Sequence, residues 1–223
     1  MFNFGTRIQL GPLASRPWLA LLGLIFSLAF GSAHADADLA RTKVLVLGDS
    51  ISAGYGINAE EGWVNLLQKS LTEAESGWQV VNASISGETT GGGLARLPKL
   101  LSEHDPAVVI IELGGNDGLR GYPVPKMRNN LQTMVEMVQQ REAEAVLMAM
   151  RIPPNYGRRY TQAFEQAFVD VSEKFETVLV PFFLEPIALE TGMMQADGIH
   201  PTATAQPLMR DFALQYLGPV LLD

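Results

Sequence analysis

Histidine is scarce in this chain of 223 residues, which narrows the choice of a general base. The three histidines are His34, His104 and His200. His34 lies in an N-terminal segment that we expect to be removed. His104 lies at the predicted end of a helix, where the helix dipole favours a histidine for structural reasons. His200 is therefore the candidate base, since imidazole ordinarily titrates close to neutral pH.

Asp197 precedes His200 by three residues, across Gly198 and on a turn that Pro201 ends. This spacing allows the Asp197 carboxylate to reach one imidazole nitrogen while the other nitrogen faces a pocket. A carboxylate in that position fixes the tautomer of the base and stabilises the imidazolium. In the structural alternative, Asp197 is only a turn residue and His200 only precedes a helix.

Ser50 is the candidate nucleophile. It follows an apolar run and Gly48-Asp49, which predicts a tight turn from a strand into a helix. Its hydroxyl would then be exposed beside the N–H groups of a helix start. Serine becomes an effective nucleophile only when a base accepts its proton. The structural alternative is a plain helix N-cap, because many such turns carry a serine.

Gly87 and Asn116 are candidate donors to a negatively charged oxygen. Each belongs to a polar cluster that follows a predicted strand, in 82–87 and 114–117. Acyl transfer develops negative charge on the carbonyl oxygen, and preorganised N–H groups stabilise that charge. In the structural alternatives, Gly87 is a left-handed turn residue and Asn116 makes a local turn bond.

Short apolar runs alternate with longer amphipathic runs across residues 36–223. This alternation is typical of a parallel sheet with crossover helices. The predicted strands cover 43–47, 79–81, 107–113, 145–150 and 178–180. The predicted helices cover 61–76, 93–102, 125–142 and 160–175. A last helix follows Pro201 and carries Leu208, Phe212 and Leu217.

Three of the polar clusters follow the ends of predicted strands, and the fourth lies before the last helix. The carboxyl ends of parallel strands meet at one edge of a sheet, where ligands bind. We therefore expect Ser50, Gly87, Asn116 and the pair Asp197 and His200 to converge there. Together they supply a nucleophile, a base, an orienting carboxylate and oxyanion donors.

Composition and length favour one globular α/β domain. The chain is 47% hydrophobic and 18% charged, and a chain of this length buries a core without needing a disulfide or a metal. It contains no cysteine, which excludes a cysteine nucleophile, a thiolate metal site and a disulfide framework. We see no repeat and no linker, and we predict a single domain over 36–223.

Residues 1–35 have the pattern of a secretory signal peptide. Arg7 and Arg16 make the start positive, 18–30 is almost continuously apolar, and Ala33-His34-Ala35 fits a cleavage site. Cleavage after Ala35 would leave a periplasmic or secreted chain without stable membrane insertion. The alternative is an uncleaved N-terminal anchor, because apolar residues also occur before the apolar run.

Removal of that segment makes the chain more acidic. The full sequence has 16 Lys and Arg against 24 Asp and Glu, a net charge of −8. Residues 1–35 hold two Arg and no acidic residue, so the remainder has 14 against 24, a net charge of −10. An acidic chain without a basic stripe argues against nucleic-acid binding and against docking on anionic lipid.

The four polar clusters, in their order and spacing, resemble the four signature blocks of the SGNH (GDSL) hydrolases. The resemblance covers 43–217 and implies a flavodoxin-like three-layer α/β/α sandwich with a central parallel sheet. It also implies a triad of Ser50, Asp197 and His200. The implied oxyanion hole consists of the Ser50 N–H, the Gly87 N–H and the Asn116 side chain.

The blocks around Asn116 and His200 further resemble the bacterial periplasmic branch of acyl-CoA thioesterases, lysophospholipases and arylesterases. In that branch the loop after the asparagine closes over the acyl chain. Here the loop is 118–123, and the candidate substrate-binding residues are Gly118, Leu119, Arg120 and Tyr122. Met193 and Met194 could also line an acyl groove, and Arg120 could instead be merely solvated.

The sequence thus predicts a serine hydrolase that cleaves small-molecule acyl esters or thioesters, as a monomer and without a metal or cofactor. One alternative is a carbohydrate or small-molecule acetylesterase with the same triad. Another is a non-enzymatic periplasmic binding protein on this fold. Phosphate or flavin binding at 48–56 is a further alternative, but that loop lacks the glycine spacing of a nucleotide loop.

Overall fold

The computed structural model describes residues 42–222, which form one compact unit. The predicted signal segment, 1–35, lies outside the described residues, and so does its cleavage site. Over the described part of the chain, no helix combines the length and apolar character needed to cross a membrane.

Within the described residues, five strands alternate with helices. The strands are β1 (Lys43–Gly48), β2 (Gln79–Asn82), β3 (Val108–Glu112), β4 (Glu144–Met148) and β5 (Val178–Val180). The helices are α2 (Ser50–Ala53), α3 (Trp63–Glu73), α4 (Thr90–His104), α5 (Gly115–Leu119), α6 (Val124–Gln139), α7 (Arg158–Phe175) and α8 (Gln206–Leu221). Short 3-10 turns occur at Ala59–Glu61, Pro154–Tyr156 and Ala203–Ala205.

All strand pairs are parallel, and the strand order is β2-β1-β3-β4-β5. This is the flavodoxin-like order, in which the chain changes direction across the sheet between β1 and β3. A crevice forms at the carboxyl ends of those two strands, because their following loops diverge to opposite faces. The predicted fold class is confirmed, and Ser50 and Asn116 both follow strands at this point.

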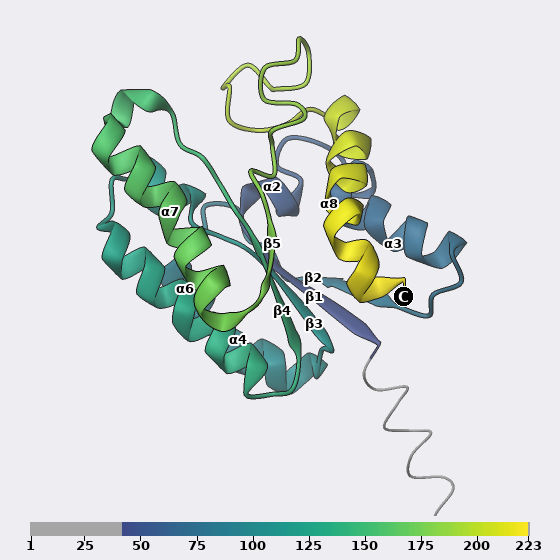
Figure 1. Ribbon diagram of the computed structural model, residues 1–223. Coiled ribbons are helices and arrows are strands. Elements are labelled where there is room, and N and C mark those ends of the chain that lie inside the picture. The colour runs from purple at the N-terminus through teal and green to yellow at the C-terminus, as the bar shows by residue number, and fades with distance from the viewer. Residues whose placement is uncertain (1–41, 223) are drawn as a thin grey trace, which may run out of the picture. The chain divides into compact units, whose positions relative to one another are not determined.

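Helices cover both faces of the sheet (Figure 1), because successive residues of the buried strands point to opposite sides. Leu45 and Leu47 of β1 pack in the core beneath α4, α6 and α7. Val44 and Val46 pack in the other core, beneath α3 and α8. A strand that is buried on both faces reads as a continuous apolar run, which explains why these strands were predictable.

Of the three apolar residues noted for the last helix, Leu217 is buried and Phe212 packs against the core, but Leu208 is not part of the buried face. Leu208 is 42% exposed, whereas Met209 is fully buried. The buried residues of α8 are Gln206, Met209, Ala213, Leu217 and Leu221. Because α8 carries apolar residues around most of its circumference, the sequence pattern left its orientation ambiguous.

Helix α4 begins at Thr90, three residues earlier than predicted, although three glycines follow. The Thr89 hydroxyl accepts the N–H of Gly92 at 3.3 Å and caps the helix. A Cβ on Gly93 would lie 2.3 Å from Leu113, at the end of β3. The glycines therefore allow the start of α4 to approach the sheet closely, which outweighs their low helix propensity.

Candidate active site

The turn after β1 presents Ser50 at the first position of α2. Asp49 is the N-cap of this helix, and its Oδ1 accepts the N–H of Ile51 at 3.0 Å. Gly54 ends the helix in the left-handed conformation, with φ of 72°. This short capped helix places the Ser50 hydroxyl beside the carboxyl end of the sheet.

Gly48 leaves room for a buried acid beneath the turn. A Cβ on Gly48 would lie 2.6 Å from Oε2 of Glu112 and 2.7 Å from Cβ of Ser52. Oε2 of Glu112 accepts the Ser52 hydroxyl at 2.6 Å and the Asp49 N–H at 3.3 Å. Glu112 thus ties the end of β3 to the turn that carries Ser50.

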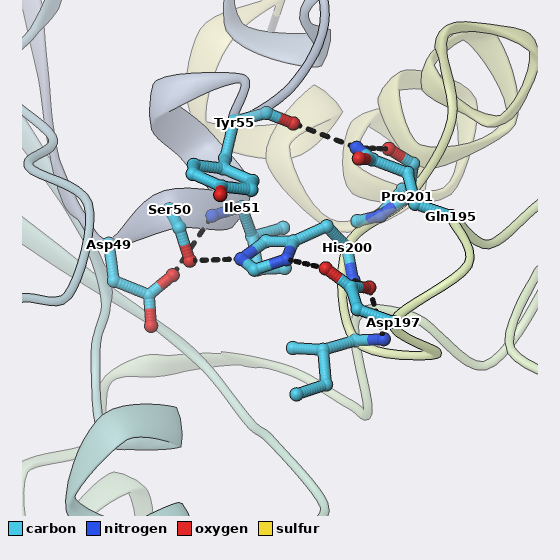
Figure 2. Close-up of polar contacts among 9 residues, drawn as sticks. Asp49, Ser50, Ile51, Tyr55, Gln195, Asp197, His200 and Pro201 are labelled. Atoms are coloured by element: carbon cyan, nitrogen blue, oxygen red, sulfur yellow. Dashed lines mark hydrogen bonds and ion pairs between the residues drawn. The ribbon is translucent and has the colours of Figure 1, made fainter.

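Ser50, His200 and Asp197 form a hydrogen-bonded series (Figure 2). The His200 Nε2 lies 2.9 Å from the Ser50 Oγ, and the Nδ1 lies 2.7 Å from Oδ2 of Asp197. A proton on Nδ1, donated to Asp197, leaves Nε2 free to accept the serine proton. The geometry is that of a nucleophile, a base and an orienting carboxylate.

Asp197 has two roles in the turn before His200. Its Oδ1 accepts the N–H groups of Ile199 and His200, at 2.9 and 3.0 Å. The hydrogen bond from the His200 ring and these two backbone bonds hold the pKa of Asp197 below its usual range. The carboxylate therefore stays ionised, and its two oxygens fix the turn and the ring separately.

Two residues that the sequence did not single out hold His200 in place. The Tyr55 ring lies 4.4 Å from the imidazole, centroid to centroid. The Gln195 N–H donates to the carbonyl of His200 at 2.7 Å, and its side chain donates to the carbonyls of Tyr55 and Pro201 at 2.8 and 2.9 Å. Gln195 thus links the segment that carries His200 to the segment after α2 (Figure 2).

The three predicted oxyanion donors come from three different segments. The Asn116 amide lies in α5, where its Nδ2 donates to Oδ2 of Asp49 at 3.0 Å. Within residues 42–222, the N–H groups of Ser50 and Gly87 have no hydrogen-bond acceptor. Gly87 has φ of 80°. Its loop is attached to the end of β1, because the Ile85 N–H donates to the Gly48 carbonyl at 3.1 Å.

Two buried carboxyl groups lie beneath the nucleophile turn. Burial raises the pKa of Asp49 to about 6, although the bonds from Ile51 and Asn116 oppose this shift. Burial, followed by the charge of Asp49, raises the pKa of Glu112 well above its usual value. Glu112 was not predicted as a site residue, and its only signal was an acid at the end of an otherwise apolar strand.

Substituting Glu112 by glutamine is expected to make stability less dependent on pH. In the wild type, the folded chain keeps a proton on Glu112 that the unfolded chain releases above pH 4.5. The free energy of unfolding therefore falls as pH rises above that value. Glutamine is neutral at every pH, so this position no longer contributes to the fall of the free energy of unfolding with rising pH. Thermal unfolding of both proteins, followed from about pH 5 to about pH 8, measures the difference.

At the acidic end of this series the two proteins should have similar stability, because the glutamine carbonyl can still accept from Ser52 and Asp49. At the alkaline end the variant should be the more stable protein. A variant whose midpoint falls as steeply with pH as that of the wild type would contradict the assignment of a raised pKa to Glu112.

A cavity of about 520 Å³ opens beside Ser50 and His200. Asp49, Glu112 and Asn116 contribute polar groups to its lining. Most other lining side chains are apolar, among them Leu119, Ile152, Pro153, Phe182, Phe183, Leu184, Leu189, Met194 and Ile199. A cavity of this size and character fits an apolar ligand with a small polar head.

The four predicted substrate-binding residues have different surroundings. Leu119 lines the cavity, whereas Gly118 is buried, and a Cβ there would lie 2.6 Å from Ile152. Arg120 donates to the Gly87 carbonyl at 3.0 Å, so it is not merely solvated. Tyr122 lies outside the cavity and lines a separate surface hollow.

The remaining sequence candidates are also placed by the structure. Met194 lines the cavity, whereas Met193 packs against the core beneath α8. His104 is the last residue of α4, at the helix end where the dipole favours a positive group. That end of α4 precedes β3, so His104 lies toward the opposite edge of the sheet from Ser50.

Comparison with known proteins places this arrangement in a family. A model described as the GDSL-like Lipase/Acylhydrolase family matches residues 46–206. Esterase TesA of Pseudomonas aeruginosa is 50% identical over 182 residues, which are 82% of this chain and 90% of the relative. Thioesterase 1/protease 1/lysophospholipase L1 of Escherichia coli is 44% identical over 194 residues, which are 87% of this chain and 89% of the relative.

A solved structure agrees with this fold. The psychrotrophic esterase EstA from Pseudoalteromonas, in a structure inhibited by monoethylphosphonate, has a TM-score of 0.78 and 46% identity. The match covers 82% of this chain and all of EstA. The chain belongs to the GDSL-like lipase/acylhydrolase family.

Proposed function

We propose that this protein is a serine hydrolase that cleaves carboxylic esters and thioesters through an acyl-Ser50 intermediate. The observation that carries the proposal is the series from Ser50 to His200 to Asp197, with contacts of 2.9 and 2.7 Å beside an apolar cavity. The family membership and the names of the relatives support it.

In the acylation step, Ser50 Oγ attacks the carbonyl carbon while His200 Nε2 accepts the hydroxyl proton. The new C–O bond forms as the carbonyl π electrons move to oxygen. The N–H groups of Ser50 and Gly87 and the Asn116 amide would bind that oxyanion. When the tetrahedral intermediate collapses, His200 returns the proton to the departing alcohol or thiol.

Deacylation repeats the same chemistry with water. His200 accepts a proton from a water molecule that attacks the acyl carbonyl, and the intermediate then expels Ser50 Oγ, which regains the proton. Asp197 stabilises the imidazolium in both halves of the cycle, because its carboxylate faces Nδ1. His200 accepts and returns one proton in each half of the cycle.

The cavity favours medium or long acyl groups over acetate. An acetyl group would fill only a small part of about 520 Å³, whereas an alkyl chain could contact Leu119, Ile152 and Phe183. Removal of each buried methylene from water contributes about 0.8 kcal/mol. We therefore propose acyl esters and thioesters of medium or long chains as the substrate class, rather than acetylated carbohydrates.

The test is hydrolysis of p-nitrophenyl esters from acetate to palmitate by the purified protein. A parallel sample is labelled with a fluorophosphonate, and the labelled peptide is identified by mass. Activity that peaks beyond acetate, with the label on Ser50, is the expected result. Activity on acetate alone would favour the acetylesterase. Absence of both hydrolysis and label would favour a binding protein.

Ester and thioester preference needs a matched pair of substrates. An alkyl ester and an alkyl thioester of the same acyl group would share the acyl-Ser50 intermediate, so they should have the same deacylation rate. Any difference in their kcat/KM values would arise in acylation. Both members of the pair are expected to be hydrolysed and to stop reacting once Ser50 carries the label.

The proposal extends to location and assembly. Export to the periplasm or the medium rests on the pattern of residues 1–35, and N-terminal sequencing of the cell-derived protein tests cleavage after Ala35. A monomer is proposed because one chain supplies Ser50, His200, Asp197 and the cavity. Light scattering of the purified protein tests this state.

A further inference from the structure

The proposed oxyanion hole depends on two loops whose separation must be fixed. Gly87 lies in the loop between β2 and α4, and Asn116 lies in α5, after β3. Oxyanion donors work at about 2.7–3.1 Å from the developing charge. A small displacement of one loop would therefore weaken the hydrogen bonds to the oxyanion. The structure must hold the two loops at a fixed distance from each other.

A buried bridge joins these two loops. The Asp117 side chain, 4% exposed, accepts both donors of Thr90. The Thr90 N–H lies 2.8 Å from Oδ2, and the Thr90 hydroxyl lies 2.6 Å from Oδ1. Asp117 directly follows Asn116 in sequence, and Thr90 follows Gly87 by three residues. The bridge thus lies one residue from Asn116 at one end and three residues from Gly87 at the other.

The surroundings of the bridge limit its freedom to rearrange. Asn130 of α6 donates its Nδ2 to the Thr90 hydroxyl at 3.0 Å, so that hydroxyl both donates and accepts. The carboxylate also lies at the N-terminus of α4, where backbone N–H groups and the helix dipole favour negative charge. Each side chain of the bridge is thus held by more than one hydrogen bond.

Arg120 makes a second and weaker connection between the same loops. Its guanidinium donates to the Gly87 carbonyl at 3.0 Å, but the side chain is exposed and competes with water. This bond orients the same residue whose N–H faces the proposed oxyanion. The two connections therefore act on one geometric variable, the position of Gly87 relative to Asn116.

We propose that Asp117 and Thr90 are positioning residues that set the separation of two of the three oxyanion donors, the Gly87 N–H and the Asn116 amide. The proposal rests on the proposed function, because it concerns the same reaction. Neither side chain needs to touch the substrate. Their effect passes through the loops that carry Gly87 and Asn116, so it should fall on the transition state more than on substrate binding.

The test compares Thr90→Val with Thr90→Ser. Valine keeps the shape of threonine and removes the hydroxyl, which leaves Oδ1 of Asp117 without its Thr90 bond. Displacement of a catalytic group by about 1 Å lowers rates by about 100-fold. We therefore expect kcat for a p-nitrophenyl ester to fall about 10- to 100-fold, with KM nearly unchanged. Serine keeps the hydroxyl and should restore most of kcat.

The same substitution elsewhere in the chain provides a matched control. Thr177 is also buried, and it directly precedes β5 at the amino edge of the sheet. Its hydroxyl donates to the carbonyl of Ala145 in β4. Thr177→Val should lower the unfolding midpoint, as Thr90→Val does, because each leaves a buried acceptor with one bond fewer. Only Thr90→Val should lower kcat.

A double substitution separates positioning from general destabilisation. In an Asn116→Ala protein one of the two donors that the bridge positions is gone, so the distance between the loops matters less. Thr90→Val should then have a clearly smaller effect on kcat than it has in the wild type. If Thr90→Val does not fold, Asp117→Asn is measured in the same way, since it keeps the size and changes the hydrogen-bonding pattern.

Three results would overturn the proposal. They are an unchanged kcat in a folded Thr90→Val or Asp117→Asn protein, an equal loss of kcat in Thr177→Val, and full additivity with Asn116→Ala. Failure of the proposed function would look different, because the wild type itself would then neither hydrolyse the ester nor take the fluorophosphonate label.

Discussion

Replacing Ser50 by alanine is expected to lower kcat for ester hydrolysis by about 10⁴-fold or more. In the proposed mechanism the Ser50 Oγ carries the acyl group, and it lies 2.9 Å from His200 Nε2. Without the hydroxyl no covalent intermediate forms, and only the weak hydrolysis promoted by the cavity and the oxyanion donors remains. Single-turnover hydrolysis of a p-nitrophenyl ester measures this loss.

The folded structure should tolerate this change. The cap of α2 is supplied by Asp49, and the Ser50 carbonyl, which alanine keeps, accepts the N–H of Tyr55 at 3.0 Å. Stability should therefore change by about 0.5 kcal/mol or less. Ser76 lies after α3, and its hydroxyl donates to the Leu71 carbonyl; Ser76→Ala is the matched control and should keep full activity. Wild-type turnover by Ser50→Ala would refute the acyl-enzyme mechanism.

The sheet could be predicted from the sequence because burial on both faces leaves a simple pattern. Val44, Val46, Val109 and Ile111 belong to uninterrupted apolar runs, and all are fully buried. Polar clusters at the ends of such runs then marked one edge of the sheet. These two features predicted a parallel sheet and a site at its carboxyl edge, since parallel strands bring their carboxyl ends together, whereas the flavodoxin-like fold was implied by the resemblance to the SGNH hydrolases.

The loop that follows α5 was less predictable. Side chains in irregular segments have no fixed period, so spacing could not show that Leu119 lines the cavity while Tyr122 lies in another hollow. The same limit applied to Arg120, whose partner is a backbone carbonyl in a different loop. The sequence showed the chemical type of each side chain in this loop, but it did not show where that side chain points.

The polar supports of the site were missed for a related reason. Glu112 contacts Ser52, and Asp117 contacts Thr90, across sequence separations of 60 and 27 residues. Each pair is specified by close packing at the crevice rather than by a periodic pattern. Such side chains are expected behind an active site, because the reacting groups need support that holds their geometry.

Asp197→Asn is the second substitution with a large expected effect, and it tests orientation rather than nucleophilicity. The asparagine Oδ1 can still accept the N–H groups of Ile199 and His200, which Asp197 binds at 2.9 and 3.0 Å. Its NH₂ group would then face His200 Nδ1, where the carboxylate Oδ2 now lies at 2.7 Å. Because an amide N–H donates, Nδ1 must become an acceptor.

This exchange moves the imidazole proton to Nε2, which faces Ser50, and the base is lost while the turn is kept. We expect kcat to fall by about 10³- to 10⁴-fold with a similar KM. Asp211→Asn is the control, since Asp211 also accepts a hydrogen bond from a side-chain nitrogen, the Arg210 Nε at 2.6 Å, but lies on α8 outside the cavity. A small effect of Asp197→Asn on kcat would mean that the carboxylate only shapes the turn. A large effect in a protein of unchanged stability would mean that it sets the protonation of His200.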